Sequence, residues 1–446
     1  MAAAVPSDHR AVPVSRPDGS SHPAQRPTNL TLLPFRALRY AAGDLGALTS
    51  PPYDVLDADG VAALEAASDH NVVRLILPRG EPGTGLDRYQ RAKQTLEDWR
   101  EEGVLVPDPE PALYVYEQAA PGGHVQRGLL GALALSPSED GIVLPHENTM
   151  SGPVGDRLAL YDAVDADLEL IFLVYDGGGA ASRAVQEADR ETPVVDEVLP
   201  DGLRHRLWAL TDPDRLGEIA ADLASRRALI ADGHHRYATY LRRQAAHHES
   251  GDGAGPWDTG LTFLVDAQAF GPEVHPIHRV VPGRDAGALA DLASTGFAAE
   301  SFDGDLDGAL GALAAAGRQG PAFLLASGDR STVRLLSAPD QARLAAALPA
   351  ERSAAWRALD VSVLHGYVVP ELWGMQDTVE NVSYAHHVGA ALAAAARTGG
   401  TAVLLNATPV EGVVAVAAGG ERMPRKSTLF TPKPRTGLVL LDHRDA

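Results

Sequence analysis

A short apolar strand that ends in a glycine turn and continues directly into a helix constrains this fold more than any other feature. The apolar run Ala228–Ala231 is followed by Asp232-Gly233, and apolar residues then recur at helical spacing at Ala238, Leu241 and Ala245. Glycine lets the backbone turn sharply, and the first N–H groups of the following helix have no partner within it. The unit predicts a sheet with helices packed against it, and a helix start that faces an anion.

Elsewhere, strands and helices alternate only in places. We expect strands at Val72–Leu77, Ala112–Glu117, Gly128–Leu135, Gly141–Leu144, Leu168–Tyr175, Leu261–Asp266, Phe323–Leu325, Arg334–Ser337, Ala402–Leu405 and Val413–Ala417. We expect helices over Leu86–Leu105, from Asp212-Pro213 onward, and over most of Gly287–Gly317. This irregular alternation favours an α+β, mixed α/β architecture with mixed sheets over a single parallel sheet.

The length of 446 residues is enough for two or three domains. Residues 1–29 are rich in Pro, Ala, Ser and His without a period, so we expect a disordered tail there. We expect the ordered chain to divide into regions 30–135, 136–281 and 282–446. The last region ends in a basic, proline-rich tail from Gly419 to Leu441.

Charge and composition exclude several classes of function. The formal net charge of −21 predicts that the surface repels nucleic acid and anionic membranes, so we expect neither as a partner. The chain has no cysteine, which excludes disulfides, thiolate metal sites and cysteine nucleophiles. No apolar run approaches the ~20 residues that span a bilayer, and we expect a cytoplasmic protein.

The first candidate site is the turn itself, which contains Asp232, Gly233, His234, His235 and Arg236. The helix start offers N–H groups to an anion, and the planar guanidinium of Arg236 suits phosphate oxygens. The structural alternative is a helix cap whose polar residues are only solvated.

The second candidate is Pro145-His146-Glu147-Asn148-Thr149, followed by Asp156-Arg157. A glutamate at the end of a strand, next to a histidine, can act as the general base for a hydroxyl group. The alternative is a solvated glutamate in an exposed loop.

The third candidate is the basic tail, with Arg425, Lys426, Ser427, Thr428 and Lys433. It imitates the phosphate loop G-x-x-x-x-G-K-[ST], but Arg425 replaces the second glycine and Pro424 removes an N–H group, so we reject that interpretation. The cluster of cations and hydroxyls still suits a phosphate or a carboxylate. Alternatively, the tail pairs with the acidic surface of the protein itself.

The fourth candidate is His275-Pro276-Ile277-His278-Arg279. Two histidines three residues apart can be metal ligands, but the proline disfavours a helical pair, and we favour a loop that orders the site. Asn381, Tyr384 and His386-His387 are compatible with substrate contacts.

Taken together and in this order, the motifs resemble a known family. Besides those above, the pattern includes Pro51-Pro52-Tyr53-Asp54, Tyr237 and the run from Met423 through Phe430 and Pro432. The chain resembles the bacterial and archaeal domain of unknown function 1015 family, from about Leu30 to Leu441.

The middle of the chain is also similar to the free serine kinases of the ParB/sulfiredoxin-like superfamily. This resemblance implies a ParB/sulfiredoxin-like central region with additional mixed-sheet regions on both sides. It implies that Glu147 takes the proton of a serine hydroxyl, that Gly233, His234, His235 and Arg236 cradle phosphates, and that Asp232 binds Mg²⁺ or substrate. The stretch between the motifs is longer here, the flanking regions have no counterpart in the small kinases, and the chain lacks both the sulfiredoxin cysteine and a basic helix-turn-helix.

The leading hypothesis is a Mg²⁺-dependent phosphotransferase that acts on a small hydroxyl substrate, with free L-serine the best single choice. The donor is a nucleotide or pyrophosphate, and the basic tail closes over its phosphates. His146 assists Glu147 and Asp232 in catalysis. The residues expected to bind substrate or order the site are Thr149, Asp156, Arg157, His278 and Arg279. The alternatives are a non-catalytic nucleotide or anion sensor, and a metal hydrolase built from His146, His234, His235 and His278.

Overall fold

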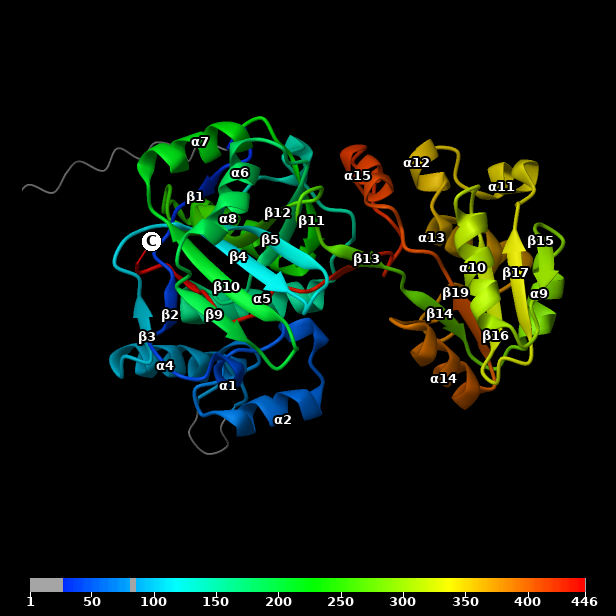
Figure 1. Ribbon diagram of the computed structural model, residues 1–446, viewed down its shortest axis with the longest axis horizontal. Helices are drawn as coiled ribbons and strands as arrows, with labels where there is room; N and C mark the ends of the chain where they lie inside the picture. Colours follow the sequence, from blue (N-terminus) through cyan, green and yellow to red (C-terminus); the bar gives the residue numbers. More distant parts are fainter. Residues whose placement is uncertain (1–26, 81–85, 446) are drawn as a thin grey trace, which may run out of the picture.

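The computed structural model describes residues 27–80 and 86–445 and shows two lobes side by side (Figure 1). Almost all of the predicted disordered tail, residues 1–29, lies outside the described residues. The chain builds the larger lobe first and then the smaller one, and its last residues return to the larger lobe. No helix in the described ranges is both long and apolar enough to cross a membrane.

The larger lobe is organised around a nine-stranded mixed sheet with the order β6-β11-β8-β12-β5-β4-β10-β9, in which β1 also pairs with β5. The pairs β11–β6 and β12–β8 are parallel, and the others are antiparallel. The strands are β1 Leu32–Leu33, β4 Leu113–Ala119, β5 Val125–Ala134, β6 Val143–Leu144, β8 Ile171–Tyr175, β9 Val195–Val198, β10 Arg204–Leu210, β11 Ala228–Asp232 and β12 Thr259–Asp266.

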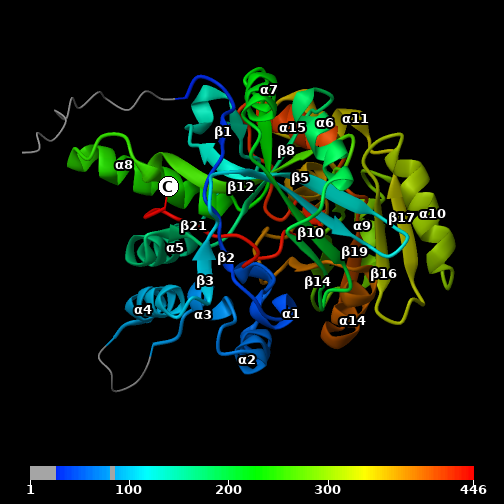
Figure 2. The ribbon, with the colours of Figure 1, turned by 60° about the vertical axis from the view of Figure 1, so that its left-hand side comes forward.

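Helices cover one face of this sheet, and α5 packs between α4 and α8 (Figure 2). The helices are α1 Leu45–Leu48, α2 Ala58–Ala67, α3 Val73–Ile76, α4 Arg88–Glu101, α5 Ser151–Val164, α6 Ala180–Glu187, α7 Pro213–Leu223 and α8 His234–Ser250, with 3-10 turns at Tyr53–Val55, Ser138–Asp140, Ala188–Arg190 and Pro256–Asp258. The opposite face carries Phe172 and Phe263, which belong to an apolar cluster that continues to Phe323 and Trp356 in the smaller lobe. The two lobes therefore share a core.

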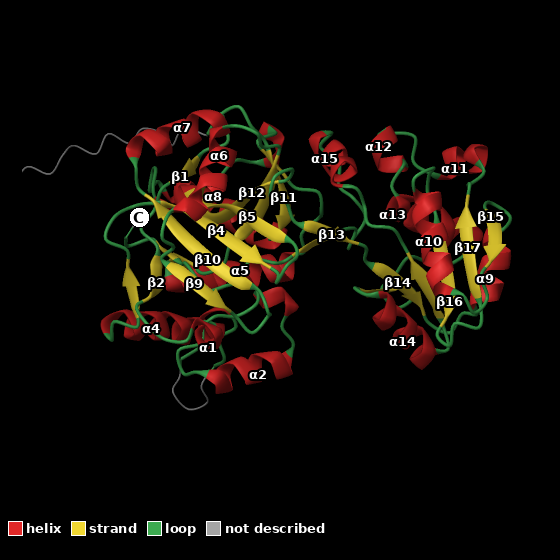
Figure 3. Ribbon diagram, in the orientation of Figure 1, coloured by secondary structure: helices red, strands yellow, loops and turns green. Residues whose placement is uncertain are grey.

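The smaller lobe contains a six-stranded antiparallel sheet with the order β15-β17-β16-β19-β14-β18 (Figure 3). The strands are β14 His278–Val281, β15 Ala298–Ser301, β16 Phe323–Ser327, β17 Val333–Ser337, β18 Ser383–Ala385 and β19 Thr401–Leu404. The helices are α9 Ala286–Ala293, α10 Leu306–Gly317, α11 Gln341–Ala347, α12 Ala354–Arg357, α13 Asp360–Val363, a π-helix at Leu364–Leu372, α14 Val388–Thr398 and α15 Val410–Ala418.

The segment from Pro424 to Asp442, here called the strap, carries the chain back to the larger lobe. Three two-stranded pairs complete the structure: β2 Leu38–Tyr40 with β3 Leu105–Pro107, β7 Ala166–Asp167 with β21 Leu441–Asp442, and β13 Glu273–His275 with β20 Leu429–Thr431. The strap supplies β20 and β21. Its backbone also accepts hydrogen bonds from two buried glutamines, with Gln118 Nε2 3.0 Å from the Lys433 carbonyl and Gln126 Nε2 2.9 Å from the Pro432 carbonyl.

The expected mixed-sheet α/β class is confirmed, but several local predictions are wrong. Val72–Leu77 contains α3 and Val413–Ala417 lies within α15, because a short buried apolar run does not distinguish a strand from a helix. His275–Arg279 is mostly strand, with β13 and β14 separated by two residues. Strands from regions 30–135 and 136–281 share the nine-stranded sheet, so the boundary expected after residue 135 runs through one sheet.

Candidate functional site

Segments that are far apart in the sequence meet around a cavity of about 310 Å³. The larger lobe contributes the Tyr53 turn, the end of β6 and the β11–α8 turn, and the strap closes the cavity from the other side. The polar residues that line it are Tyr53, Asp54, His146, Glu147, Asp232, His234, His235, Arg236, His386, Lys426, Thr428 and Lys433, and Gly233 lies among them. Most of the sequence-predicted site residues are therefore brought together.

The start of α8 forms one wall of the cavity. Gly233 has a φ of +93°, and a Cβ at this position would lie 3.2 Å from Arg236 Nε, so the turn requires glycine. No side chain of the described residues caps this 17-residue helix. Its first N–H groups and the positive end of its dipole are therefore available to a negatively charged group.

Arg236 and Asp232 are bound to each other rather than exposed as separate ligand-binding groups. Arg236 is 1% exposed, its Nη2 donates to Asp232 Oδ2 at 2.5 Å, and its Nη1 donates to the Leu170 carbonyl. The other Asp232 oxygen accepts from Lys433 Nζ at 2.5 Å. The guanidinium thus holds the turn in place, which differs from the free phosphate-binding fork expected from the sequence.

The rings of His234 and His235 fasten the Glu147 segment to α8. The His146 N–H donates to His234 Nε2 at 3.2 Å, and the Met150 N–H donates to His235 Nε2 at 3.1 Å. Burial lowers the pKa of His146 to about 4 and lowers the pKa values of His234 and His235 as well. Because their Nε2 atoms are occupied, the His234 and His235 rings are not free to bind a metal ion through those atoms.

Glu147 lies in the segment that these two bonds hold, and it lines the cavity. Burial raises the pKa of its carboxyl, and Asp232 adds to this effect, while Lys426 and the Ser427 N–H oppose it. A half-buried carboxylate with a raised pKa has the properties of a general base. The geometry keeps Glu147 as the candidate for that role.

The two lysines of the strap differ in their environments. Lys433 Nζ lies 2.5 Å from Asp232 and 3.2 Å from Asp54 Oδ2. Burial opposes its charge, but these two carboxylates raise the pKa of the ammonium above its usual value. Lys426 is exposed and forms no ion pair with any described residue, so its charge is available to an anionic ligand.

The remaining strap residues have separate positions. Thr428 Oγ1 lies 2.9 Å from His146 Nε2 at the cavity wall. Ser427 is buried, and its hydroxyl donates to the Pro424 carbonyl at 2.5 Å. Arg425 is exposed and does not line the cavity. Lys426, Thr428 and Lys433 therefore reach the cavity, whereas Ser427 supports the loop.

Five further predicted residues lie outside the cavity lining: Thr149, Asp156, Arg157, His278 and Arg279. Thr149 is exposed, and Asp156 pairs with Arg88 at 2.5 Å and with Arg157 at 2.6 Å. His278 is buried, and its Nδ1 accepts from the Leu405 N–H at 3.2 Å. Because His278 lies apart from the cavity histidines, the four histidines of the hydrolase alternative do not form one cluster.

A buried charge cluster beneath Tyr53 was missed from the sequence. The Glu169 carboxylate is 1% exposed, accepts from the Tyr53 N–H at 3.0 Å, and lies 3.6 Å from Arg157. The Arg157 and Arg236 guanidinium carbons lie 4.4 Å and 5.9 Å from the Tyr53 ring centroid. The rigid Pro51-Pro52 turn is the one sequence signal in this region, and it precedes Tyr53 and Asp54, which line the cavity.

The donor set does not fit a magnesium ion held by Asp232. Both oxygens of Asp232 are bound to cations, and the described residues contain no group of three or more His, Asp or Glu side chains placed to hold a metal ion. A cation at Asp232 would have to displace Arg236 or Lys433. We therefore derive no reaction step through Mg²⁺.

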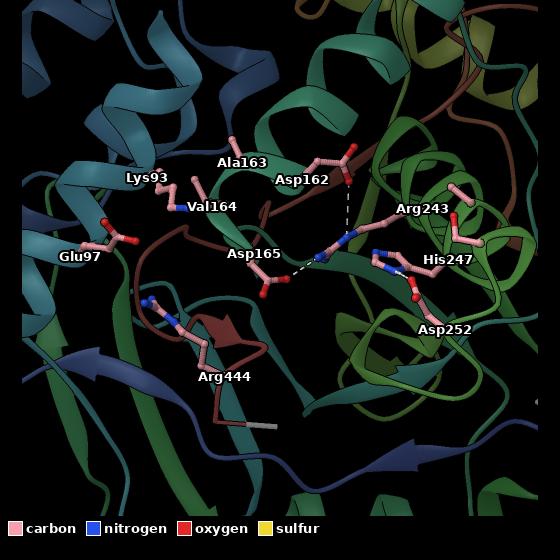
Figure 4. A pocket seen from close by; sticks show the side chains of 12 residues that line it. Lys93, Glu97, Asp162, Ala163, Val164, Asp165, Arg243, His247, Asp252 and Arg444 are labelled. Atoms are coloured by element: carbon pink, nitrogen blue, oxygen red, sulfur yellow. Dashed lines mark hydrogen bonds and ion pairs between the residues drawn. The ribbon is translucent and has the colours of Figure 1, made fainter. Parts of the chain in front are cut away.

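A wider hollow of about 570 Å³ lies near the chain end, between α5 and α8 (Figure 4). Its central charges neutralise one another: Arg243 binds Asp165 at 2.5 Å and lies 3.6 Å from Asp162, and His247 binds Asp252 at 2.7 Å. None of the sequence-predicted site residues lines it. The cavity at Gly233 remains the candidate site.

Comparison with known families identifies the class of this chain. The family described as protein of unknown function (DUF1015) matches residues 32–362, and the chain belongs to this family. The match ends before the strap, whereas the resemblance seen in the sequence extends to about Leu441. No curated protein matches the chain.

Several solved structures are similar in part. A mutant free serine kinase in complex with ADP has 13% identity and a TM-score of 0.34, over 68% of this chain and 91% of that one. A conserved hypothetical protein from Pyrococcus furiosus has 12% identity and a TM-score of 0.31, over 68% and 94%. SbnI with a C-terminal truncation from Staphylococcus aureus has 11% identity and a TM-score of 0.36, over 70% and 87%. At these TM-scores the likeness assigns no activity to this chain, so the function is argued from the cavity.

Proposed function

We propose that this protein is a phosphotransferase that moves a phosphoryl group from a nucleotide or pyrophosphate to a small hydroxyl compound. Free L-serine is the first substrate to test. The observation that carries the proposal is the composition of the cavity. An uncapped helix start and an unpaired lysine can hold phosphate, and Glu147 can accept a proton.

We place the donor phosphates between the start of α8 and Lys426, which both line the cavity. Anionic oxygens there receive hydrogen bonds from the N–H groups of the first turn and the charge of the ammonium. Phosphoryl transfer depends mainly on such positioning and charge neutralisation. The volume of about 310 Å³ suits a small acceptor molecule.

In the proposed reaction, Glu147 takes the proton from the substrate hydroxyl as its oxygen forms a bond with the terminal phosphorus. The bond between that phosphorus and the bridging oxygen of the donor breaks, and the leaving group keeps the electron pair. The proton then passes from Glu147 to solvent. The His146 ring does not take part in this step; its backbone N–H donates to the His234 ring, and this bond holds the Glu147 segment against α8.

The proposal is tested by incubating the purified protein with L-serine, L-threonine, L-homoserine and glycerol, each with ATP, ADP or pyrophosphate, with and without added Mg²⁺. Mass spectrometry detects a product that is heavier by one phosphoryl group. A product that forms with wild type and not with Glu147→Gln supports the proposal. If no combination gives product while calorimetry shows that a donor binds, the non-catalytic sensor is the correct interpretation.

A further inference from the structure

Lys426 holds a backbone conformation that a lysine rarely adopts. Its φ is +55°, in the left-handed region where a Cβ is unfavourable. Such a residue is retained where the surrounding structure fixes it, and these positions concentrate at functional sites. Lys426 is also the cation of the cavity that forms no ion pair with a described residue, so its backbone conformation decides where this charge lies.

Hydrogen bonds to the two neighbouring carbonyl groups hold this conformation. Arg279 Nη2 donates to the Arg425 carbonyl at 3.3 Å, and Thr408 Oγ1 donates to the Ser427 carbonyl at 3.1 Å. Arg279 and Thr408 come from the smaller lobe, before and after its β19 strand. The loop that presents Lys426 is therefore fixed from that lobe.

Arg279 is itself immobilised. It lies on β14 with 0% exposure, its Nη1 donates to the Ile277 carbonyl at 2.5 Å, and its guanidinium carbon lies 4.8 Å from the Tyr384 ring centroid. Its Nε donates to His365 Nε2 at 3.0 Å. Each nitrogen of the guanidinium thus has a partner, which a lysine could not reproduce.

The contact continues to the surface through His365 and Asp377. His365 lies in the π-helix, and because its Nε2 accepts from Arg279, the neutral ring carries its proton on Nδ1. That Nδ1 lies 3.0 Å from Asp377 Oδ1, and the Asp377 side chain is 35% exposed. Asp377, His365, Arg279 and the Arg425 carbonyl form a continuous chain of contacts that ends next to Lys426.

We propose that Asp377, His365 and Arg279 are positioning residues that set Lys426 for binding the phosphate groups of a nucleotide or pyrophosphate. This inference rests on the proposed function of the cavity and assigns to the smaller lobe the task of placing its free cation. The larger lobe already fixes its own side through Asp232, Arg236 and the histidines. Asp377, His365 and Arg279, here called the relay, fix the loop that carries Lys426 without forming an ion pair with the lysine.

A double-mutant cycle tests whether the relay acts through Lys426. Calorimetry measures the affinities of pyrophosphate and ADP for wild type, Arg279→Lys, Lys426→Ala and the double variant. We expect Arg279→Lys to weaken binding about fivefold in the wild-type background and less than about twofold when Lys426 is already alanine, because coupled residues are not additive. If Arg279→Lys weakens binding by the same factor with and without Lys426, or has no effect in either case, the proposed role of the relay is wrong.

Asp377→Ala is the second relay variant, because Arg279 is fully buried and its replacement can unfold the protein. Asp377 is partly exposed, so the fold is expected to tolerate alanine, and the same non-additive loss of affinity is expected on a smaller scale. Glu380→Ala is the matched control, since Glu380 is an exposed carboxylate three residues away. If Lys426→Ala alone leaves both affinities unchanged, the proposed anion site and the relay are both wrong. If Lys426→Ala weakens binding but the relay variants act independently of it, only the relay is wrong.

Discussion

The charged groups Asp232, Arg236 and Lys433 at the cavity are bound to one another, whereas Lys426, held from the smaller lobe, forms no ion pair with any described residue. Asp232 bridges Arg236 and Lys433, each at 2.5 Å. Lys426 lies only seven residues before Lys433 on the same strap, yet its ammonium faces the cavity unpaired. The comparison separates cations that maintain the site from the cation that can recognise a ligand.

This difference has a physical basis in burial. A buried charge must be paired, because removing it from water carries a large penalty, so Arg236 and Lys433 require Asp232 and Asp54. An exposed lysine keeps its hydration and can exchange water for phosphate oxygens at lower cost. The ion pairs of Asp232 therefore hold the site in a fixed geometry, whereas Lys426 supplies a charge that can bind a ligand.

Glu147→Gln should have the largest effect, because it removes the carboxylate that is proposed to act as the general base. Glutamine has nearly the same shape but cannot accept the hydroxyl proton, so turnover should fall by ~10²–10⁴-fold. Donor affinity should stay within about twofold, because Glu147 is not one of the groups proposed to bind the phosphates. Initial rates from product mass, together with calorimetric titration of the donor, measure both quantities.

The control for this variant is Glu139→Gln, an exposed carboxylate in the 3-10 turn before β6. It should change neither rate nor affinity. Wild-type turnover by Glu147→Gln would show that the central residue of the mechanism is wrong. A loss of donor affinity equal to the loss of rate would assign Glu147 to binding rather than to proton transfer.

Arg236→Met should act mainly on stability, because Arg236 holds the turn in place. If it acted mainly on ligand binding instead, Arg236 would not be a cation that only maintains the site. The change leaves Asp232 with only Lys433 and the Leu170 carbonyl without its donor, and disruption of a buried ion pair costs about 3–5 kcal/mol of unfolding free energy. Urea denaturation measures this loss. Arg242→Met, at an exposed position on the same helix, should change the unfolding free energy by less than about 0.5 kcal/mol.

The role of Arg236 shows where sequence reasoning succeeds and where it fails. The strand, glycine and helix of β11–α8 were predicted correctly because propensity, periodicity and turn chemistry agree locally. The sequence also marked Arg236 as important. It did not indicate that the guanidinium turns back to Asp232 one helical turn earlier, because side-chain direction and burial depend on packing against β8 and Tyr53.

Long-range contacts explain the remaining differences. The strap reaches the cavity because Gln118 and Gln126 bind its backbone, and neither glutamine carries any motif. Glu169 was missed for the same reason: it lies between β7 and β8, and a single acidic residue beside an apolar run has no pattern that reveals its partners. The short buried helices at Val73–Ile76 and Val410–Ala418 lack the polar face that would distinguish them from strands.

The far end of the strap provides a pH test of how firmly it is anchored. His443 is buried between Asp165 at 3.3 Å and Asp167 at 3.2 Å; burial opposes its charge, but these carboxylates raise its pKa to about 9. Because the folded pKa exceeds the unfolded value of ~6.5, this stabilisation is fully present below pH 6.5 and is lost as the pH rises through about 9. At about 1.4 kcal/mol for each pKa unit, the loss should reach about 3 kcal/mol.

Urea denaturation from pH 6 to pH 10 checks this expectation by comparing wild type with His443→Gln. The difference in unfolding free energy between the two proteins should shrink as the pH rises, because only wild type loses the charged histidine. A difference that stays constant over this range would mean that the His443 charge does not anchor the strap.

Lys426→Ala should have the smallest effect and tests the comparison most directly. Loss of one exposed ammonium should weaken pyrophosphate or ADP binding about tenfold, and should leave the unfolding free energy unchanged within about 0.5 kcal/mol. Lys433→Ala should behave in the opposite way, because it leaves Asp54 and Asp232 without their shared cation and lowers stability.

Salt and a second substitution separate charge from backbone conformation at this position. Raising the ionic strength should reduce the advantage of wild type over Lys426→Ala, because an exposed charge is screened. Lys426→Gly relieves the left-handed backbone but also removes the ammonium. If the charge is what matters, Lys426→Gly should bind donor as weakly as Lys426→Ala while being the more stable of the two. If Lys426→Gly instead retains wild-type affinity, the loop backbone rather than the lysine charge recognises the phosphate, and the distinction between the two lysines fails.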